Sequence, residues 1–371
     1  MPDARGGRLA IVHDWLTGMR GGEKVLEALC EVFPDADIHT LLHVRGAVSP
    51  VIERHRIRTS FVQRLPFAPR LYRHYLPLFP TAIELLNLDG YDAVLSVSHC
   101  AAKSVIVRGG AQHVCYCLTP MRYAWDQFGA YFGPERVGSV GSTALRPVLA
   151  WLARSDAATA KRAHRYVAIS RYVAARIARY YNREAGVVHP PVDTDFFQPG
   201  AWPVTSRHAL VVSALVPYKR IDVAIDACRE AGIPLRIAGD GPDIGRLRKQ
   251  AGDTATFLGR LPDEEIRAEY RNAAVVLLPG VEDFGIVPLE AQACGTPVVA
   301  LAEGGALETV VDGRTGALVT GRSAAAFAGG IRRVLDAPPD PGAIRAHAER
   351  FGYARFAAEM RACLDGLGTS A

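Results

Sequence analysis

Two glutamates, Glu282 and Glu290, stand eight positions apart in the stretch VEDFGIVPLEAQACGTPVVA. The residues between them predict the start of a helix, Phe284-Gly285-Ile286 followed by Pro288, which a first turn tolerates. One helix face cannot carry both carboxylates, because eight steps of an α-helix leave them about 80° apart. The free N–H groups of 284–286 instead point from the first turn, with Glu282 just before it. Donors and acceptors together suit a polyhydroxylated ligand, with Glu290 taking the two hydroxyls of a ribose.

Cations suited to a diphosphate stand in a second stretch, SALVPYKRID. This stretch ends a predicted strand and opens a helix with Lys219 and Arg220. Two cations beside a helix N-terminus match the charge of a diphosphate. A solvated first turn explains the same two residues equally well, so the segment predicts a phosphate site only in combination with others.

Two glycine-containing turns also follow predicted strands. TGMRGGEKVLEAL places Gly21 and Gly22 in the turn after the first strand, directly before a helix whose N-terminus favours anions. IAGDGP contains Gly239 and Gly241, which permit close approach of a ligand to the backbone. The first is not a Walker loop and the second is not a G-x-G-x-x-G fingerprint. A plain tight turn therefore remains open as the explanation of either loop taken alone.

The bulk composition predicts a soluble globular protein. The 371 residues suffice for two domains with sizeable cores, with 49% hydrophobic and 22% charged residues. A net charge of +5, from 43 basic and 38 acidic residues, does not indicate nucleic acid as a partner. Seven scattered cysteines without a CxxC pair indicate buried thiols in a reducing compartment. Without a signal-peptide core or an apolar run of membrane-spanning length, we expect a cytoplasmic protein that can visit a membrane surface.

Short apolar runs alternate with helical patterns along the whole chain, as in RLAIVHDW, DAVLSVS and HVCYCL and again, after Pro190-Pro191, in HALVVSAL, PLRIAG and AVVLLP. Strands that alternate with helices predict parallel sheets, and two such series predict two α/β domains. We place the boundary near residues 190–200. Ligands of such sheets bind beyond the carboxyl ends of the strands, so two facing sheets would share a cleft.

A basic and aromatic segment spans residues 52–80. It interleaves arginines with aromatic residues: Arg54, Arg56, Arg58, Arg64, Arg70 and Arg73 with Phe61, Phe67, Tyr72, Tyr75 and Phe79. This mixture suits an anionic lipid surface or the phosphate groups of a sugar acceptor. A cleft-lining insertion with solvated arginines is the alternative, and no fold signature supports nucleic-acid binding.

With these segments in order, the chain resembles the retaining glycosyltransferases of family 4, which have the GT-B fold. EDFGIVPLEAQACGTPVVA is similar to the E-x7-E signature of that family, and further blocks follow the family order over nearly the whole chain: GGEKVL, SVSHCAAKSVIV, TPMRYAWD, AISRYVAARI, HPPVD, PYKRID, IAGDGP, FLGRL and GGALETVVDGRTG. The E-x7-E block and the combined order are specific, whereas each glycine loop alone is weak. The likeness is to bacterial polysaccharide and mannosyltransferase-type members.

The resemblance implies an α/β architecture of two Rossmann-like domains facing across a cleft. Residues 1–193 would form the acceptor-binding domain and residues 194–351 the nucleotide-sugar domain. Residues 352–371 would form a helix that crosses back to the first domain, which accounts for the helix left over after the second series.

The resemblance also assigns roles to single residues. Glu290 holds the donor ribose, Glu282 with the 284–286 amides holds the donor sugar, and Lys219 neutralises the diphosphate with help from Gly22. The remaining donor-site residues are Gly21, Arg220, Gly239, Gly241 and Leu258, the last with the GRLPDEE loop at the nucleobase. His99, just after a predicted strand, contacts the acceptor or the diphosphate, unless it is a buried capping histidine. Leu118, Arg122 and Tyr123 lie on the acceptor side.

The family pattern implies no metal and no cofactor beyond the nucleotide-diphosphate sugar itself, a GDP- or UDP-linked donor. Retention follows from front-face attack, in which the leaving phosphate takes the acceptor proton. The partners are this donor and a glycan or lipid-linked acceptor, presented at the inner face of a membrane that residues 52–80 contact.

Two positions depart from the family pattern. Ala214 stands where relatives commonly carry an arginine before the lysine, and Leu118 stands where the family usually has a histidine that reaches the 6-hydroxyl of the donor sugar. Leucine cannot hydrogen-bond there but packs against a methyl group or open space. The hypothesis is a 6-deoxyhexose or pentose donor, and weakened activity is the alternative. A non-catalytic nucleotide-sugar-binding partner and a nucleotide-sugar epimerase of the same fold remain open as functions.

Overall fold

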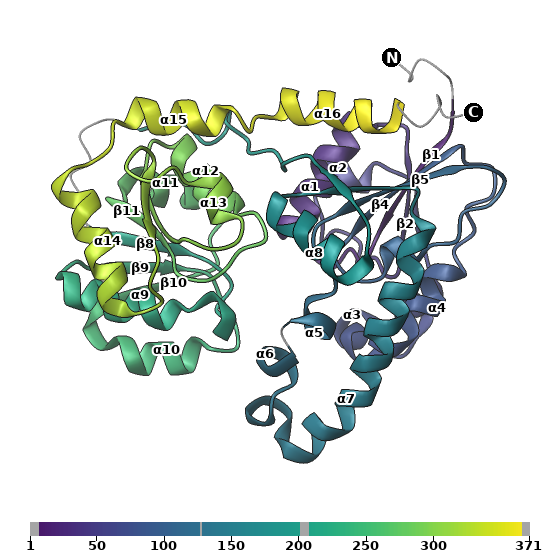
Figure 1. The fold of residues 1–371 in the computed structure, drawn as a ribbon, viewed down its shortest axis with the longest axis horizontal. Helices are drawn as coiled ribbons and strands as arrows, with labels where there is room; N and C mark the ends of the chain where they lie inside the picture. Colours follow the sequence, from purple (N-terminus) through teal and green to yellow (C-terminus); the bar gives the residue numbers. More distant parts are fainter. Residues whose placement is uncertain (1–6, 127, 201–207, 366–371) are drawn as a thin grey trace. The chain divides into compact units, whose positions relative to one another are not determined.

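The computed structural model describes residues 7–126, 128–200 and 208–365 (Figure 1). The chain divides into two compact units, one of Met1–His189 with Phe356–Ala371 and one of Pro190–Arg355. The two divisions fall near the predicted ones after residues 193 and 351. Each unit is a parallel sheet covered by helices, which is the predicted Rossmann-like architecture.

The first unit contains a seven-stranded parallel sheet in the order β3-β2-β1-β4-β5-β6-β7. In the central register, Ile11 of β1 pairs with Ile38 of β2 on one side and Leu95 of β4 on the other. Strands covered on both faces read as nearly continuous apolar runs, which is why LAIVH and AVLSVS were recognisable. The strands are β1 (Leu9–His13), β2 (Asp37–Thr40), β3 (Ile57–Thr59), β4 (Ala93–Ser98), β5 (Gln112–Cys117), β6 (Arg165–Ala168) and β7 (Ala185–Val187).

Helices of very different length connect these strands. The 26-residue α7 (Pro134–Thr159) is broken at Gly138, whose φ of 73° is not helical. Residues 52–80 hold the short strand β3 and a series of short helical elements, of which α3, η2 and α4 follow one another directly. The other elements are α1 (Gly21–Val32), α2 (Pro50–Glu53), η1 (Phe61–Arg64), α3 (Ala68–Leu71), η2 (Tyr72–Leu78), α4 (Phe79–Glu84), η3 (Ala102–Ser104), α5 (Arg122–Trp125), α6 (Phe128–Phe132), η4 (Ala160–Arg162) and α8 (Arg171–Tyr181).

The second unit contains a six-stranded parallel sheet in the order β10-β9-β8-β11-β12-β13. Its strands are β8 (Ala209–Val212), β9 (Leu235–Ala238), β10 (Ala255–Gly259), β11 (Val275–Leu278), β12 (Val298–Leu301) and β13 (Gly316–Val319). Its helices and turns are η5 (Pro217–Lys219), α9 (Ile221–Ala231), α10 (Ile244–Ala251), η6 (Gly252–Thr254), α11 (Asp263–Asn272), α12 (Ile286–Ala293), α13 (Ala306–Thr309), α14 (Ala324–Asp336) and α15 (Pro341–Glu349).

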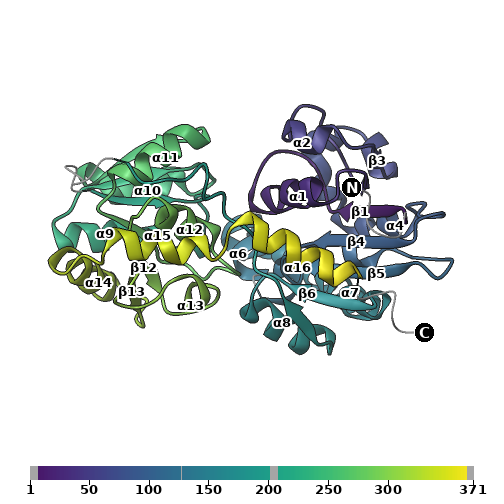
Figure 2. The ribbon, with the colours of Figure 1, turned by 90° about the horizontal axis from the view of Figure 1, so that it is seen from above.

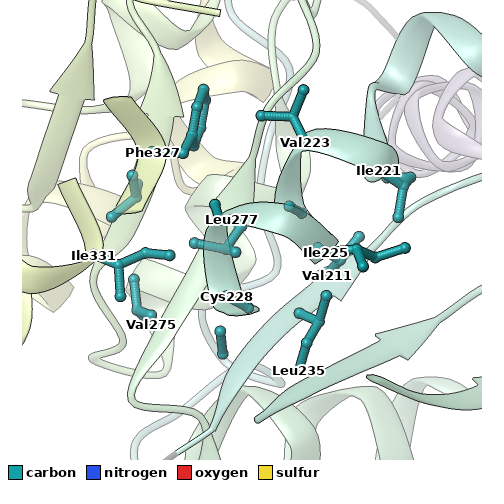
Figure 3. Packing of buried hydrophobic residues seen from close by; sticks show 14 of the residues in the cluster. Val211, Ile221, Val223, Ile225, Cys228, Leu235, Val275, Leu277, Phe327 and Ile331 are labelled. Carbon is teal, nitrogen blue, oxygen red and sulfur yellow. The ribbon is translucent and has the colours of Figure 1, made fainter. Parts of the chain in front are cut away.

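The core of the second unit lies between this sheet and helices α9 and α14. Figure 3 shows Ile225 and Cys228 of α9 and Phe327 and Ile331 of α14 directed at strand residues such as Leu277. All five of these side chains are at most 1% exposed. Burial of an apolar side chain of this size contributes about 1.5–3 kcal/mol. This packing supports the sheet whose strand ends carry the candidate site.

Helix α16 (Tyr353–Asp365) starts in the last residues of the second unit and joins the first unit from Phe356 onward (Figure 2). The Phe356 ring is fully buried and meets the ring of Tyr116 on β5 with centroids 6.0 Å apart. Arg165 on β6 donates a hydrogen bond to the carbonyl of Cys363 at 3.1 Å. The predicted helix that returns to the first domain is therefore present, and its described part ends at residue 365.

Candidate functional site

Each sheet reverses its strand order at one place, and the loops after the strands at these two places carry His99, Lys219 and Glu282 of the predicted site residues. In the first sheet β1 and β4 are neighbours, and in the second β8 and β11 are neighbours. The loops after two such strands run in opposite directions and leave a crevice at the carboxyl edge, where ligands of α/β proteins bind. Asp14 and His99 follow β1 and β4, and the loops after β8 and β11 carry Lys219 and Glu282.

Lys219 and Glu282 form an ion pair at the switch point of the second unit. The ammonium of Lys219 contacts Oε1 of Glu282, and the two side chains are 15% and 16% exposed. Lys219 ends the turn η5, and Glu282 lies in the loop between β11 and α12. Partial burial keeps these charges poorly screened, so they act strongly on any ligand that reaches them. The structure thus brings together a cation and a carboxylate that the sequence separates by more than sixty residues.

Close backbone contacts hold these two loops in place. A side chain on Gly280 would put its Cβ 2.7 Å from the carbonyl oxygen of Tyr218 and 2.8 Å from the Cα of Lys219. A side chain on Gly305 would put its Cβ 2.3 Å from the Cα of Phe284, and Gly305 N–H donates to the Glu282 carbonyl at 2.8 Å. Distances below 3 Å exclude any side chain, so both loops require glycine at these positions.

Gly239 and Gly241 allow equally close backbone contacts with the loop after β8. A Cβ on Gly239 would lie 1.8 Å from the carbonyl oxygen of Ser213, and one on Gly241 would lie 2.3 Å from that of Leu215. We predicted that these glycines let a ligand approach the backbone. In the structure, the backbone of the neighbouring loop, at Ser213 and Leu215, lies close to them. Leu258 is partly buried near the end of β10, whose Gly259 carbonyl accepts from Gly239 N–H at 2.7 Å.

Helix α12 begins at Ile286, with Gly285 as its N-cap at φ 98°. The predicted first turn is therefore wrong by two residues, because Phe284 lies before the cap. The Phe284 side chain is 3% exposed, and its ring centroid lies 5.9 Å from that of Phe351. This buried contact holds Phe284 outside the helix. The backbone donors of Gly285 and Ile286 remain at the helix N-terminus.

Glu290 lies one turn into α12 and is 6% exposed. Its Oε2 accepts a hydrogen bond from the hydroxyl of Tyr270 at 2.9 Å. Burial and then the charge of Glu290 raise the pKa of Tyr270 well above its usual value, so the phenol stays a donor. Tyr270 fixes one carboxylate oxygen of Glu290 and orients the other.

Two neighbours of Lys219 are placed differently from it. Arg220 adopts a left-handed conformation at φ 53°, and its Nε lies 3.2 Å from Asp222 in its own helix α9. Ala214 is exposed in the loop after β8. Among the described residues on this loop, Lys219 is thus the cation that faces Glu282.

Asp14 organises the switch point of the first unit. Its buried carboxylate accepts four backbone N–H bonds, from His99 at 2.7 Å, Cys100 at 2.9 Å, Ala101 at 2.6 Å and Ala102 at 2.8 Å. Nδ1 of His99 lies 3.1 Å from the same carboxylate, and the His99 side chain is 26% exposed. Burial lowers the pKa of His99 more than Asp14 raises it, so the imidazole is predominantly neutral at pH 7.

Gly21 and Gly22 are the first two residues of α1, not the turn before it as predicted. A Cβ on Gly22 would lie 3.2 Å from Cδ1 of Leu118 and 3.9 Å from Cε1 of His13. Leu118 is 8% exposed and follows β5 directly. The predicted donor-sugar position therefore packs against the first turn of α1.

A buried pair lies behind this turn. Nε2 of His13 and Oε1 of Glu23 are 3.8 Å apart, and both side chains are nearly inaccessible. Burial raises the pKa of Glu23, but the proximity of His13 and of His99 outweighs burial and lowers that pKa overall. Glu23 is therefore ionised, and a negative charge in the first turn stabilises the helix.

Arg122 starts α5, and its charge lowers the pKa of His99, so it lies near the same switch point. Tyr123 follows in α5, and its side chain is outside the described part of the structure. The loop holding them is tied down by Arg176 of α8, which donates to Thr119 Oγ1 at 2.6 Å and contacts Asp126. Trp125 donates from Nε1 to Asp156 of α7 at 2.8 Å.

Two family models match the chain and together reach from residue 19 to residue 353. "Glycosyltransferase Family 4" matches residues 19–196 and "Glycosyl transferases group 1" matches residues 192–353. The chain belongs to glycosyltransferase family 4.

Several members of family 4 align with about half of the chain. The GDP-mannose-dependent α-(1-6)-phosphatidylinositol monomannoside mannosyltransferase of Mycolicibacterium smegmatis is 36% identical over 200 residues, 46% of this chain and 52% of the relative. D-inositol 3-phosphate glycosyltransferase 2 of Catenulispora acidiphila is 32% identical over 234 residues, 53% of this chain and 54% of the relative. The chain thus spans about half the length of the curated relatives it matches.

Solved structures match the fold over nearly the whole family 4 chain. HepE from Anabaena in complex with UDP has a TM-score of 0.70 at 17% identity and covers 97% of this chain and 100% of its own. Sucrose-phosphate synthase from Thermosynechococcus elongatus has a TM-score of 0.74 at 21% identity, covering 98% and 100%. The chain therefore has the GT-B arrangement of two Rossmann-like domains.

Asp14, His13, Glu23, Tyr270 and Arg176 are not among the residues that the sequence predicts for the site. Asp14, His13 and Glu23 stand in HDWLTGMRGGE, where the prediction used only the glycines. Acidic and histidine residues next to a strand end are a usable signal of a binding site. Tyr270 and Arg176 lie on helices far along the chain from their partners, and their sequence context carries no such signal.

No group of three or more His, Cys, Asp or Glu side chains in the described ranges could hold a metal ion. No helix within those ranges is long and apolar enough to cross a membrane.

Proposed function

We propose that this family 4 protein transfers a sugar from a nucleotide-diphosphate sugar to a glycan or lipid-linked acceptor. The observation that carries the proposal is the Lys219–Glu282 pair at the second switch point, with the buried Glu290 on the adjoining helix. A cation, a carboxylate and a helix N-terminus in one crevice match the diphosphate, the sugar hydroxyls and the ribose of such a donor.

In the proposed reaction the bond between the anomeric carbon and the diphosphate oxygen breaks. The acceptor oxygen bonds to the same face of that carbon, which retains the configuration, and its proton passes to the leaving diphosphate. Lys219 stabilises the negative charge that develops on the diphosphate. Glu282, with Gly285 and Ile286, orients the sugar, so the protein contributes positioning and charge stabilisation without a metal or cofactor.

Either GDP or UDP fits the donor proposal. One relative is named for its dependence on GDP-mannose, and HepE of the same fold was solved with UDP. Leu118 bears on the sugar, because its buried side chain beside Gly22 offers no hydrogen bond. We therefore propose a sugar without a 6-hydroxyl, either a 6-deoxyhexose or a pentose.

The acceptor side favours a peripheral position on the cytoplasmic face of a membrane. Within residues 52–80, Phe67 is 71% exposed, Leu78 is 41% exposed and Leu71 is 39% exposed. No acidic residue occurs between Glu53 and Glu84, while six arginines do. Exposed apolar side chains among arginines, of which Arg58 lies near Asp37, suit attachment to anionic lipids.

Leu118 and Ala214 favour a second candidate function, a nucleotide-sugar-binding protein without turnover. At these two positions the chain carries a leucine and an alanine where the family pattern has polar or charged side chains. An intact donor site with no transfer to any acceptor would identify this function. The Glu282–Glu290 spacing argues against the epimerase alternative.

A metal-free thermal-shift screen against GDP, UDP and their sugars tests the donor proposal. Ligand binding to the folded state raises the melting temperature by mass action. We expect a clear rise with one base and a larger rise with its 6-deoxyhexose or pentose form. A preference for a plain hexose would reject the sugar proposal, and no rise with any nucleotide would reject the donor site. Binding followed by no release of nucleoside diphosphate would favour the second candidate function.

A further inference from the structure

A pocket of about 320 Å³ lies at the outer edge of the first sheet, where the edge strand β3 meets the end of α4. We call it the edge pocket. Its walls include His39 of β2, Arg58 of β3, Phe61 of η1, and Ala82, Leu85 and Leu86 at the end of α4. A volume at the lower end of the range for small-molecule sites fits a ligand with a single ring. The switch point of this unit lies between β1 and β4, so the edge pocket is separate from the candidate site.

The apolar half of the edge pocket has a buried base and an open rim. Ala82 and Leu86 are buried, whereas Phe61 is 36% exposed and Leu85 is 70% exposed. A ligand that covers these two rim residues removes apolar surface from water, which stabilises the complex. This half of the pocket therefore fits an apolar ring.

His39 presents an unused hydrogen-bond acceptor to the edge pocket. Its Nε2 lies 3.1 Å from the hydroxyl of Tyr91, and that hydroxyl donates to Asp37. Because the hydroxyl has one proton, it accepts from Nε2–H of His39, and the neutral imidazole keeps its lone pair at Nδ1. Burial, and then the charge of Arg58, lowers the pKa of His39 to about 4, so the ring is neutral at pH 7. His39 is 1% exposed, and its Nδ1 has no hydrogen-bond partner among residues 7–126, 128–200 and 208–365.

Arg58 supplies a positive charge and unused donors beside His39. The two residues are partners in the register of β2 and β3, so their side chains leave the same face of the sheet. Nη2 of Arg58 lies 3.8 Å from Asp37, too far for a hydrogen bond, and its buried Nε has no partner within the described ranges. Asp37 also lies 3.6 Å from Arg8, so one carboxylate faces two guanidinium groups. The polar half of the pocket therefore carries an excess of positive charge.

We propose that the edge pocket binds a small aromatic acid that carries a hydroxyl group next to its carboxylate. The Arg58 guanidinium binds the carboxylate, and the ligand hydroxyl donates to Nδ1 of His39. The aromatic ring packs on Phe61, Leu85 and Leu86. The hydroxyl and the carboxylate are adjacent in the ligand because His39 and Arg58 are neighbours on adjacent strands. This inference does not rest on the proposed transferase function, because the pocket shares no residue with the proposed donor site.

Titration calorimetry of the full chain with phenyllactate tests the proposal. Hydrocinnamate, which lacks the hydroxyl, and phenylpropanediol, which has a hydroxymethyl group in place of the carboxylate, are the comparisons. We expect one phenyllactate per chain. Loss of a hydrogen bond to a charged group weakens binding more than loss of a neutral one, so we expect about ten- to hundredfold weaker binding of phenylpropanediol and about three- to tenfold weaker binding of hydrocinnamate.

Two variants test the polar half of the edge pocket. Arg58→Gln should weaken phenyllactate binding by about ten- to hundredfold. His39→Gln keeps an amide near the Tyr91 hydroxyl and removes the acceptor at Nδ1, so it should bind phenyllactate and hydrocinnamate equally. The matched control is Arg54→Gln, which removes the same charge from an exposed arginine outside the pocket wall and should leave phenyllactate binding unchanged. Thermal unfolding of each variant verifies that it is folded, and Arg58→Gln, at a half-buried position, tests the site even where the buried His39 does not tolerate substitution.

Three outcomes overturn the proposal. The first is no binding of phenyllactate by the wild type at millimolar concentration, and the second is equal binding by the wild type and Arg58→Gln. The third is equal affinity of the wild type for phenyllactate and hydrocinnamate, which rejects the contact of a hydroxyl with His39. Titration of GDP and UDP in the presence of phenyllactate separates the edge pocket from the donor site. We expect unchanged nucleotide affinity, and competition between phenyllactate and a nucleotide would place the acid at the donor site and reject the edge pocket.

Discussion

The two switch points of the molecule are built in different ways. In the second unit, loops pack backbone against backbone through glycines such as Gly280 and Gly305, and one ion pair provides the charge. In the first unit, side chains do the corresponding work: the Asp14 carboxylate holds the 99–102 turn, and aromatic rings fill the space. The loops of the second unit therefore depend on glycine at fixed positions. The loops of the first unit depend instead on a few buried or half-buried side chains.

The largest effect is expected at the Lys219–Glu282 pair. Lys219→Ala and Glu282→Ala should each lower the transfer rate by about a hundred- to a thousandfold, because preorganised charge at the reacting group is lost. The assay is nucleoside diphosphate release in the presence of donor and acceptor. Lys249→Ala, at an exposed lysine of α10, is the matched control. Near wild-type rates in both site variants would show that the second switch point does not carry the chemistry.

At the switch point of the first unit, the Asp14 carboxylate should contribute strongly to the free energy of unfolding. Asp14→Asn replaces one acceptor oxygen with an NH2 group that faces backbone N–H donors, so buried donors lose their partners. We expect a loss of about 3 kcal/mol in the free energy of unfolding. Urea unfolding measures it, with Asp35→Asn at an exposed position as the control. An equal, small shift in both variants would contradict the role given to Asp14.

Both units should lose stability in acid over the same pH range. Burial lowers the pKa of His113 in the first unit to about 4, and burial with the charges of Arg350 and Arg314 lowers that of His347 in the second unit to about 4. The unfolded state binds protons below about pH 6.5 while the folded state does not. Stability is therefore complete above about pH 6.5 and falls as the pH approaches 4, by about 3 kcal/mol for each histidine.

Thermal unfolding between pH 7 and pH 4 measures this loss. His113→Asn and His347→Asn should each flatten the pH dependence, because the group that binds the extra proton in the unfolded state is removed. His74, an exposed histidine, provides the control substitution His74→Asn. An unchanged slope in both buried variants would assign the acid sensitivity to other groups.

The smallest effect is expected at Arg220. Its guanidinium already pairs with Asp222, so Arg220→Gln should change nucleotide affinity by no more than about threefold. The measurement is titration of the nucleoside diphosphate found in the thermal-shift screen. A loss as large as that of Lys219→Ala would show that Arg220 leaves Asp222 for the diphosphate and takes the place of the cation missing at Ala214.

The different construction of the two switch points also decides what the sequence could predict. Glu282, Gly285 and Glu290 lie within nine consecutive residues, so their pattern was readable, and the apolar strands β1, β4, β8 and β11 followed from their composition. The predicted start of α12 was wrong because the burial of Phe284 against Phe351 is a tertiary effect. Strand β3, with its Arg58, lacks an apolar pattern because it lies at the edge of the sheet.

The first switch point was harder to predict because its members come from distant parts of the chain. Trp15, Tyr72 and His99 carry no common motif, and only the strand order β1-β4 brings them together. The position of Asp14 after a predicted strand was a usable signal, but its partners were not predictable because they lie more than eighty residues further on. The spacing of residues in the sequence predicts contacts within one loop. Contacts between loops can be predicted only when the strand order of the sheet is known.

Helix α16 gives the chain an order of assembly during synthesis. The second unit is one continuous stretch, Pro190–Arg355, whereas the first unit includes Phe356 and the residues after it. Until Phe356 leaves the ribosome, the Tyr116 ring lacks the Phe356 ring that meets it in the folded protein. The unit that is translated first is therefore completed only after the second unit has been translated, and in the meantime its nascent chain exposes apolar surface.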